Sequence, residues 1–441
     1  MKLKNLTFKG GIHIPEFKEL SEHMAIEAAA PVKEVAIPLM QHVGVPCEPL
    51  VKRGDRVLLG QKIGDSEAGL SAPVHASVSG KVKKIEERFT SGGSRALCVV
   101  IENDGEDARG FELTNRNIED ISVEDMILLV REAGVIGMGG AAFPAHAKLQ
   151  GAQKGIDTVI INAAECEPYL TCDHRMMLEY ADRLLDGLKV MMKITKAKQG
   201  IIGIEDNKPD AIEHLTIKLR DYSNLHVAQL KTKFPQGDSY RMVDSILNRK
   251  VPVGGRTGSV HALVTNVGTC IAIGDAVVRN IPSYERVVTL TGDGISQPKN
   301  ILTRIGTSIE DMIAMGNGFS KEPKAIIVGG PMTGFAQFDE TVPVQKNTSG
   351  VLVLGKDPAT EYEMGPCIRC AKCVEGCPVN LLPLTIAQLA LKGRFEETAK
   401  YHAQSCIACG SCSYICPAHR PLTELITAAK RELKTMAKTA R

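Results

Sequence analysis

Short runs of alternating apolar and polar residues, interrupted by glycine, dominate residues 30–100. They include EPLVKRGDRVLLGQKIG at 48–64 and SAPVHASVSGKVKKIE at 71–86. Alternation with a period of two residues is typical of half-buried strands, and no helical period accompanies it here. The pattern therefore predicts a small all-β unit.

From about residue 120 the pattern changes to helices that alternate with apolar strands. A helix is predicted to begin after Ser122, whose hydroxyl can cap it, and to stop at Gly134. Strands are predicted at TVIINAA (158–164), QGIIGIE (199–205) and LHVAQL (225–230), separated by helices over 175–195 and 211–219. Alternation of this kind predicts a largely parallel sheet covered by helices.

The rest of the chain divides into two parts. A strand at 260–267 and a helix through Ile273 and Val277 lead to the strand RVVTLTG (286–292). A second strand, a short helix begun at Ser308 and the strand AIIVGG (325–330) follow. From residue 361 on, cysteine clusters and helically spaced apolar residues take over, for example Ile386, Leu389 and Ala390. The predicted fold class is a multidomain α/β protein.

Length and composition narrow the possible functions. The chain has 441 residues, too many for one typical hydrophobic core. Lysine plus arginine (53) nearly balance aspartate plus glutamate (51), which argues against nucleic-acid binding. No apolar run approaches the roughly 18 to 20 residues that cross a bilayer, and the first residues lack a signal peptide's apolar stretch. A soluble, cytoplasmic protein without a transmembrane segment is expected.

Eight of the thirteen cysteines form two clusters with identical spacing, each followed by proline. This spacing is that of thiolates that hold 4Fe-4S clusters, with the fourth cysteine of each run ligating the other cluster. Two zinc sites are the alternative, although these more often pair two short hooks across a gap. The predicted ligands are Cys367, Cys370, Cys373 and Cys416 for one cluster, and Cys406, Cys409, Cys412 and Cys377 for the second. The remaining cysteines are expected to be small buried hydrophobes: Cys47, Cys98, Cys166, Cys172 and Cys270.

Two further elements carry candidate chemistry. The glycine-rich loop from Gly134 to Pro144 precedes a predicted helix with Lys148, and glycines let backbone amides approach a phosphate. The strand at 158–164 ends in Asn162 and runs into Glu165-Cys-Glu167, at the edge where open α/β sheets bind ligands. Taken alone, each element has a simpler explanation: the glycine-rich loop could be a mere turn, and the two acids could lie in a solvated loop.

Together these elements resemble the FMN- and NADH-binding subunit of respiratory complex I, with its GxGGAGFP loop, downstream lysine and NADExEP strand end. The resemblance implies that the glycine loop, Lys148, Asn162 and Glu165 surround a non-covalent FMN. It also implies that Phe143 and Glu167 face the nicotinamide nucleotide. The chain departs from the pattern at Ala164, where the family has an acid, and at FPQGDSYRMV (234–243). The matching positions are Gly137, Gly139, Gly140, Phe143, Pro144 and Lys148, then Asn162, Glu165, Glu167 and Pro168, with Thr265 and Asn266 resembling a later flavin-contacting segment.

The order of parts resembles the C subunit of Rnf-type ferredoxin:NAD oxidoreductase complexes over nearly the full length. Residues 1–118 are expected to hold a β half-barrel similar to lipoyl and biotinyl carrier domains, a barrel-sandwich hybrid, without the modified lysine at its hairpin tip. The resemblance implies that residues 119–282 form a Rossmann-like FMN/NADH domain and residues 283–356 a β-grasp unit similar to SLBB domains. It also implies that residues 357–441 form an α-helical ferredoxin domain with two 4Fe-4S clusters.

This resemblance implies an NAD(H)-dependent iron-sulfur flavoprotein with no catalytic side chain beyond its cofactors. A flavin is the usual converter between a hydride and single electrons. The expected location is peripheral, on the cytoplasmic face of the membrane. The expected partners are the membrane subunits of an Rnf complex, which translocate ions, a ferredoxin-like subunit and, indirectly, ferredoxin. The alternatives are a soluble or microcompartment cobalamin or quinone reductase with the same cofactors, and a scaffold with a vestigial flavin site.

Overall fold

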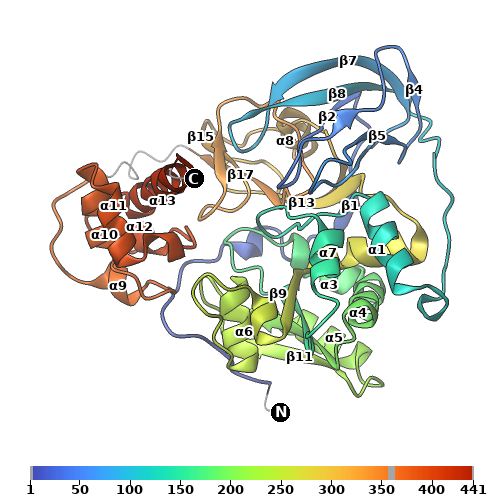
Figure 1. The fold of residues 1–441 in the computed structure, drawn as a ribbon. Helices are drawn as coiled ribbons and strands as arrows, with labels where there is room; N and C mark the ends of the chain where they lie inside the picture. Colours follow the sequence, from blue (N-terminus) through green and yellow to red (C-terminus); the bar gives the residue numbers. More distant parts are fainter. Residues whose placement is uncertain (1–2, 356–362, 440–441) are drawn as a thin grey trace.

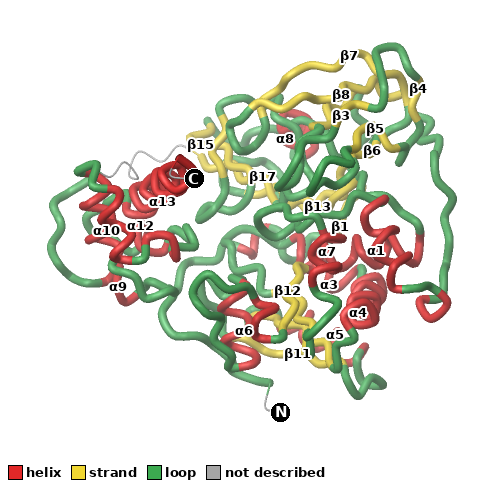
Figure 2. Tube along the Cα trace, in the orientation of Figure 1, coloured by secondary structure: helices red, strands yellow, loops and turns green. Residues whose placement is uncertain are grey.

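The computed structural model describes residues 3–355 and 363–439, which form four sheets and a separate group of helices (Figure 1, Figure 2). The helices of the cysteine-rich part gather at one side of the molecule (Figure 1). The domain boundary predicted between residues 356 and 357 lies outside the described residues. Among the described residues, no helix is long and apolar enough to cross a membrane.

Two small antiparallel sheets form the half-barrel predicted for residues 30–100. Their orders are β2-β8-β7-β4 and β3-β5-β6. Alternate side chains such as Val35, Ile37, Val99 and Ile101 point inward and are fully buried in one core. The strands are β2 (Glu34–Pro38), β3 (Glu48–Pro49), β4 (Arg56–Val57), β5 (Lys62–Asp65), β6 (Val74–His75), β7 (Gly80–Phe89) and β8 (Arg95–Asn103).

The hairpin tip of the half-barrel, which carries the modified lysine in carrier domains, is buried here. Ala72 of the tip is 0% exposed and packs with Ile136 of the glycine-rich loop. Lys346 Nζ donates hydrogen bonds of 2.7 Å to the carbonyls of Pro73 in the tip and Gly134 in the loop. The half-barrel is therefore a support for the glycine-rich loop.

A four-stranded parallel sheet with the order β11-β10-β9-β12 confirms the strands predicted between residues 158 and 267. Successive β9 side chains face opposite sides, so Ile161 packs in the core with α4 and α7, and Ile160 packs with α6. Ser122 caps α1 as predicted, because its Oγ accepts the Asp125 amide at 3.1 Å. The strands are β9 (Thr158–Ala163), β10 (Gln199–Glu205), β11 (Leu225–Leu230) and β12 (Ala262–Asn266). The helices are α1 (Val123–Glu132), α2 (Ala145–Gly151), α3 (Cys172–Glu179), α4 (Ala181–Thr195), α5 (Pro209–Lys218), α6 (Ser239–Leu247) and α7 (Val267–Gly274), which continues as the π-helical η4 (Asp275–Arg279).

The helix predicted over 175–195 is two helices, α3 and α4. They meet at Tyr180, whose backbone leaves the helical region with φ −119° and ψ 29°. Neither glycine nor proline marks the break, so the apolar spacing predicted one continuous helix. The separate α3 begins at Cys172 and turns its first backbone amides toward Glu165.

A six-stranded mixed sheet, ordered β1-β14-β13-β17-β15-β16, forms the predicted β-grasp unit. Ser308 caps α8 (Ile309–Met315), as predicted, by accepting the Asp311 amide at 3.0 Å. The edge strand β1 (Ile26–Ala28) comes from the N-terminal region and pairs in parallel with β14. Residues 3–28, which the sequence grouped with the half-barrel, thus also contact other domains. The other strands are β13 (Glu285–Thr291), β14 (Lys299–Arg304), β15 (Pro323–Val328), β16 (Phe335–Gln337) and β17 (Gly350–Gly355).

The cysteine-rich part is helical, as predicted. Its core contains Ile386 of the helix between the two cysteine runs, together with Leu422 and Ile426 of α13. Of the residues predicted at helical spacing, Ile386 and Ala390 are buried. The helices are α9 (Lys372–Glu375), α10 (Pro383–Leu391), α11 (Phe395–Thr398), α12 (Ser411–Tyr414) and α13 (Leu422–Thr439).

Candidate functional site

Two adjoining cavities lie along the glycine-rich loop, one of about 640 Å³ and one of about 500 Å³. All of the residues predicted to contact flavin or nucleotide line one cavity or both. The larger cavity is lined by Glu165 and Glu167, the smaller by Gly137, Phe143, Lys148 and Thr265, and both by Gly139, Gly140, Asn162 and Asn266.

Two asparagines at the sheet edge line both cavities. Asn162 is the last residue but one of β9 and the register partner of Asn266 at the end of β12, so parallel pairing brings the two side by side. Asn162 Nδ2 donates to the Gly237 carbonyl at 2.7 Å, and Asn266 Nδ2 donates to Asp173 Oδ2 at 2.6 Å. These bonds fix both amides at the carboxyl ends of the strands.

The glycines of the loop meet different surroundings. A Cβ on Gly139 would lie 2.8 Å from the Asn266 Cβ, too close for any side chain. A Cβ on Gly140 would meet no protein atom within 4 Å. Gly139 thus lets the loop lie against Asn266, and Gly140 leaves backbone open to the cavities, as close approach of a flavin requires.

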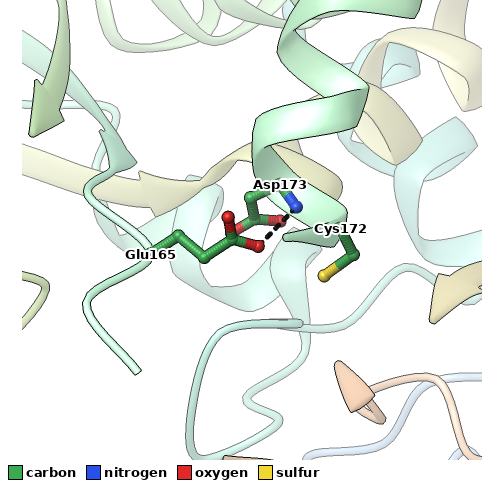
Figure 3. Close-up of side chains that lie close together, drawn as sticks. All are labelled: Glu165, Cys172 and Asp173. Carbon is green, nitrogen blue, oxygen red and sulfur yellow. Dashed lines mark hydrogen bonds between the residues drawn. The ribbon is translucent and has the colours of Figure 1, made fainter. Parts of the chain in front are cut away.

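Glu165 and Asp173 lie next to each other at the larger cavity (Figure 3). Glu165 accepts hydrogen bonds from the amides of Asp173 at 2.7 Å and His174 at 3.2 Å, in the first turn of α3. Burial, and next the neighbouring Glu165 charge, raise the pKa of Asp173 to about 7. Cys172 completes the group, with its Sγ within 4.8 Å of a carboxylate oxygen of each acid.

Two buried polar atoms at the larger cavity have no hydrogen-bond partner among the described residues: Asp173 Oδ1 and Arg286 Nη1. Arg286 comes from β13, and its other nitrogens donate to the Thr348 and Met138 carbonyls. Buried polar atoms are almost always paired in folded proteins, so two orphans at one cavity indicate the place of a polar ligand. The cavity therefore fits the polar atoms of a bound flavin or nucleotide.

Lys148 provides a cation at the smaller cavity. Its Nζ donates to the Val264 carbonyl of β12. The side chain opens onto the cavity, but desolvation by the surrounding protein lowers its pKa to about 8. An anionic ligand would restore the charged form, so the site fits a phosphate or another anion.

Glu167 is held from the β-grasp domain. Its Oε2 accepts the Met332 amide at 3.1 Å, and its Oε1 accepts the Thr333 hydroxyl. Burial raises the pKa of Glu167, and the Thr333 hydrogen bond opposes that rise. The sequence indicated Glu167 but not these partners, which lie more than 160 residues away along the chain.

Much of the larger cavity's wall carries no local sequence signal. The half-barrel, the β-grasp domain and the ferredoxin domain each contribute, and only tertiary contacts bring them together. The segment 234–239, where the chain departs from the complex I pattern, also lines this cavity. The residues that the sequence missed are Ser91, Cys166, Leu170, Cys172, Asp173, Phe234, Pro235, Gly237, Asp238, Ser239, Arg286, Val328–Gly330, Thr333–Phe335, Asn347–Ser349 and Ile407.

The eight clustered cysteines surround two further cavities. We call Cys377, Cys406, Cys409 and Cys412 the inner set; they line a cavity of about 20 Å³. We call Cys367, Cys370, Cys373 and Cys416 the outer set; they line a cavity of about 230 Å³. In both sets the fourth cysteine of one run lies with three cysteines of the other run, in the grouping that the spacing predicts.

The surroundings of the cysteines fit iron-sulfur clusters. Backbone amides donate at 3.3 Å to Cys367, Cys377 and Cys406, the kind of N–H···S contact that clusters receive. All thirteen cysteines are free thiols. Cys47, Cys98, Cys172 and Cys270 are buried as predicted, whereas Cys166 is half-buried and lines the larger cavity.

The two sets differ in what lies around them. Cys409 and its neighbour Ile407 line the larger cavity as well, so the inner set adjoins the predicted flavin region. The outer set lies farther out: Cys370 is exposed, and 67% of Ile368 is exposed beside it. The structure thus arranges the cavities, the inner set and the outer set in that order.

Four family models match separate parts of the chain. Residues 6–106 match the RnfC barrel sandwich hybrid domain, and residues 130–275 match the Nuo51 FMN-binding domain. Residues 287–336 match the SLBB domain, and residues 366–419 match the 4Fe-4S dicluster domain. These matches confirm the predicted fold class and imply FMN and two 4Fe-4S clusters.

Curated relatives cover most of the chain. It is 43% identical over 435 residues to the C subunit of the Na(+)-translocating ferredoxin:NAD(+) oxidoreductase complex of Acetobacterium woodii, with 98% of each chain covered. It is 44% identical over 394 residues to the C subunit of the proton-translocating ferredoxin:NAD(+) oxidoreductase complex of Clostridium ljungdahlii, covering 89% of this chain and 86% of that relative.

A solved structure of an NAD+-reducing [NiFe]-hydrogenase in the H2-reduced state matches 73% of this chain and 62% of its own, with a TM-score of 0.50 and 16% identity. That likeness concerns the fold alone. The identity and coverage of the curated relatives decide the family, and they agree with the RnfC half-barrel at residues 6–106. The chain belongs to the family of C subunits of Rnf-type, ion-translocating ferredoxin:NAD(+) oxidoreductase complexes.

Proposed function

We propose that this subunit is the place where its complex exchanges electrons with NAD(H), through non-covalently bound FMN and two 4Fe-4S clusters. The observation that carries the proposal is the pair of adjoining cavities, which gathers every residue assigned to flavin and nucleotide from the sequence. Bound FMN would exchange a hydride with the nucleotide and single electrons with the clusters. The half-barrel match argues for an Rnf subunit over a cobalamin or quinone reductase.

In this proposal the chain's side chains hold and orient the ligands. Gly139 and Gly140 let backbone approach the flavin, and Asn162 and Asn266 offer amides at the sheet edge. Lys148 supplies a positive charge to an anionic group, since a cation in a partly desolvated site attracts anions more strongly than in water. Gly137, Glu165 and Thr265 complete the flavin site, while Phe143 and Glu167 face the nicotinamide nucleotide.

The inner set would hold the cluster that exchanges electrons with the flavin. Its position supports this role, because Cys409 lines both its own cavity and the larger cavity. The outer set would hold the cluster that exchanges electrons with another subunit. Partial exposure supports that role, since one-electron transfer between proteins needs a cluster close to the surface.

The surface over the outer set suggests the chemistry of that partner. Two exposed apolar side chains, Ile368 and Leu382, line the cavity of the outer set together with the cations Arg369 and Arg420. An apolar centre with a basic rim fits a redox subunit that presents an acidic surface. We expect membrane-bound and ferredoxin-like Rnf subunits in this role, with this chain peripheral on the cytoplasmic face. In this proposal the partner subunits translocate the ion.

The test is a cofactor analysis followed by rapid mixing. Anaerobically purified protein should contain one FMN per chain and enough iron and sulfide for two 4Fe-4S clusters. NADH should bleach the flavin, and an added one-electron acceptor should then be reduced. Stoichiometric zinc in place of iron, or full flavin that NADH does not bleach, would contradict the proposal.

A further inference from the structure

The loop between β15 and β16, residues 329–334, is one of the parts of the β-grasp domain that face the larger cavity. Gly329, Gly330, Thr333 and Gly334 line it, and so does Phe335, the first residue of β16. The family models describe this domain without assigning it a ligand in this chain. The loop's contacts indicate what the ligand is.

The loop is shaped around Glu167. The Met332 amide and the Thr333 hydroxyl donate to different oxygens of its carboxylate. Gly330 packs so closely that a Cβ there would lie 2.7 Å from the Glu167 Cβ. The carboxylate therefore has one preferred orientation, set by a domain other than its own, and each oxygen keeps a lone pair free for a further donor.

The loop is fixed on its other side by the inner set. A Cβ on Gly410, next to Cys409, would lie 3.0 Å from the Met332 carbonyl oxygen. Within the loop, the Gly334 amide donates to the Gly330 carbonyl at 2.9 Å. At the start of the loop, the Gly329 amide donates to the carbonyl of Gly350 in β17 at 2.8 Å. The loop is thus held between Glu167 and the inner set.

Phe335 adds an open aromatic ring to the same cavity. Its side chain is 55% exposed although it lines the cavity. The nearby Phe338 is 77% exposed, yet its ring already packs edge-on against Phe89 with centroids 5.0 Å apart. An aromatic face left open at a cavity is suited to stacking on a planar base.

We propose that the β15–β16 loop and Phe335 are the β-grasp domain's share of the NAD(H) site. Thr333 and Met332 position Glu167 to accept hydrogen bonds from nucleotide hydroxyls, and Phe335 stacks on the adenine base. The proposal rests on the proposed function, in that the larger cavity receives NAD(H). The ligand of the β-grasp domain would then be NAD(H), the same dinucleotide that binds to the adjoining FMN/NADH domain.

The first experiment removes one hydroxyl. Thr333→Val should raise the NADH concentration for half-maximal flavin bleaching about threefold to tenfold, with the limiting rate unchanged. Calorimetry with ADP-ribose should show the same loss of affinity without any turnover. Thr333→Ser should restore both values because it keeps the hydroxyl. The matched control is Thr341→Val, which removes a hydroxyl that donates to Asp339 at 2.6 Å in the same domain but outside the cavity.

The second experiment removes the ring. Phe335→Leu should weaken the response to NADH about threefold to tenfold. It should leave the response to reduced nicotinamide mononucleotide unchanged, because that compound has no adenine. Phe338→Leu, whose ring packs on Phe89, serves as the control.

The two proposals fail in different ways. If NADH does not bleach the flavin of the wild-type protein, the proposed function is wrong. If the wild-type protein responds but Thr333→Val and Phe335→Leu bind ADP-ribose and NADH as the wild type does, the β-grasp share of the site is wrong. If Thr333→Val and Thr333→Ser lost affinity for NADH and ADP-ribose equally, the proposed role of the hydroxyl would also be wrong.

Discussion

The inner and outer cysteine sets have the same spacing and the same crossed grouping, but their surroundings differ. In the inner set, Cys377 is 6% and Cys412 is 9% exposed, and Cys409 also lines the larger cavity. In the outer set, Cys370 is exposed, and none of the four cysteines lines the larger cavity. Spacing thus determines which thiolates gather, whereas packing against other domains determines what each set can reach.

The inner set is joined to the rest of the molecule by close contacts. The Gly11 amide donates to the Gly376 carbonyl at 3.2 Å, and Arg241 of α6 donates to the Pro378 carbonyl. A Cβ on Gly10 would lie 2.7 Å from the Cys377 carbonyl oxygen. The N-terminal segment and α6 therefore hold the inner set in place, next to the larger cavity. This position supports the proposed order of electron transfer: flavin, inner set, outer set.

The largest expected effect comes from the loss of FMN, because neither the inner nor the outer set could then exchange electrons with a flavin. Gly139→Val should abolish FMN binding, because any Cβ there meets Asn266, while both clusters still assemble. Flavin fluorescence after denaturation and iron analysis measure the two results. The control is Gly92→Val, since a Cβ at that exposed turn meets nothing within 4 Å. If Gly139→Val lost iron together with flavin, the flavin site and the ferredoxin domain would not assemble independently, contrary to this prediction.

The next prediction separates the two sets. Cys377→Ser should perturb the cluster of the inner set, although Cys377 belongs to the first run. Cys416→Ser should perturb the cluster of the outer set. Paramagnetic resonance spectra of the two variants, compared with those of Cys406→Ser and Cys367→Ser, measure this. The crossed grouping would be refuted if Cys377→Ser matched Cys367→Ser instead.

A smaller effect is expected on the flavin side, where Lys148 acts. Lys148→Gln should weaken FMN binding by about 1.5–3 kcal/mol, the contribution of a hydrogen bond to a charged group. Fluorescence titration of the apoprotein measures this, and both clusters should keep their spectra.

The pH dependence has a definite sign. Because the pKa of Lys148 is about 8 in the free site and an anion favours the protonated form, FMN binding takes up a proton above pH 8. Affinity should therefore fall as pH rises through 8 in the wild type. A fall of the same slope in Lys148→Gln would assign the titration to another group.

The smallest effect concerns the outer surface. Ile368→Glu places a charge in the exposed apolar centre beside the outer set and should slow electron transfer to the partner subunits about tenfold. NADH-driven flavin bleaching should not change. Leu391→Glu, at a residue 62% exposed elsewhere in the ferredoxin domain, is the control. If both variants were equally slow, the surface over the outer set would have no special role.

The sequence predicts those parts of the fold and of the candidate site that depend on residues close together along the chain. The cluster cysteines follow each other at fixed intervals, and the grouping of Cys377 with the second run was predicted from that spacing. The glycine loop and the β9 end were predicted because their residue types follow a known local pattern. Asp173, Arg286 and Thr333 were missed, since each acquires its role only when distant segments pack together. The break at Tyr180 was missed because apolar spacing continues through it.

In the proposed function, electrons pass between the larger cavity and the outer set through the inner set. The direct test is paramagnetic resonance of two variants after NADH addition, Cys409→Ser and Cys370→Ser, each with FMN bound and its intact cluster assembled. In Cys370→Ser the inner cluster should still be reduced, whereas in Cys409→Ser the outer cluster should stay oxidised although the flavin is bleached. Rapid reduction of the outer cluster in Cys409→Ser would contradict this order.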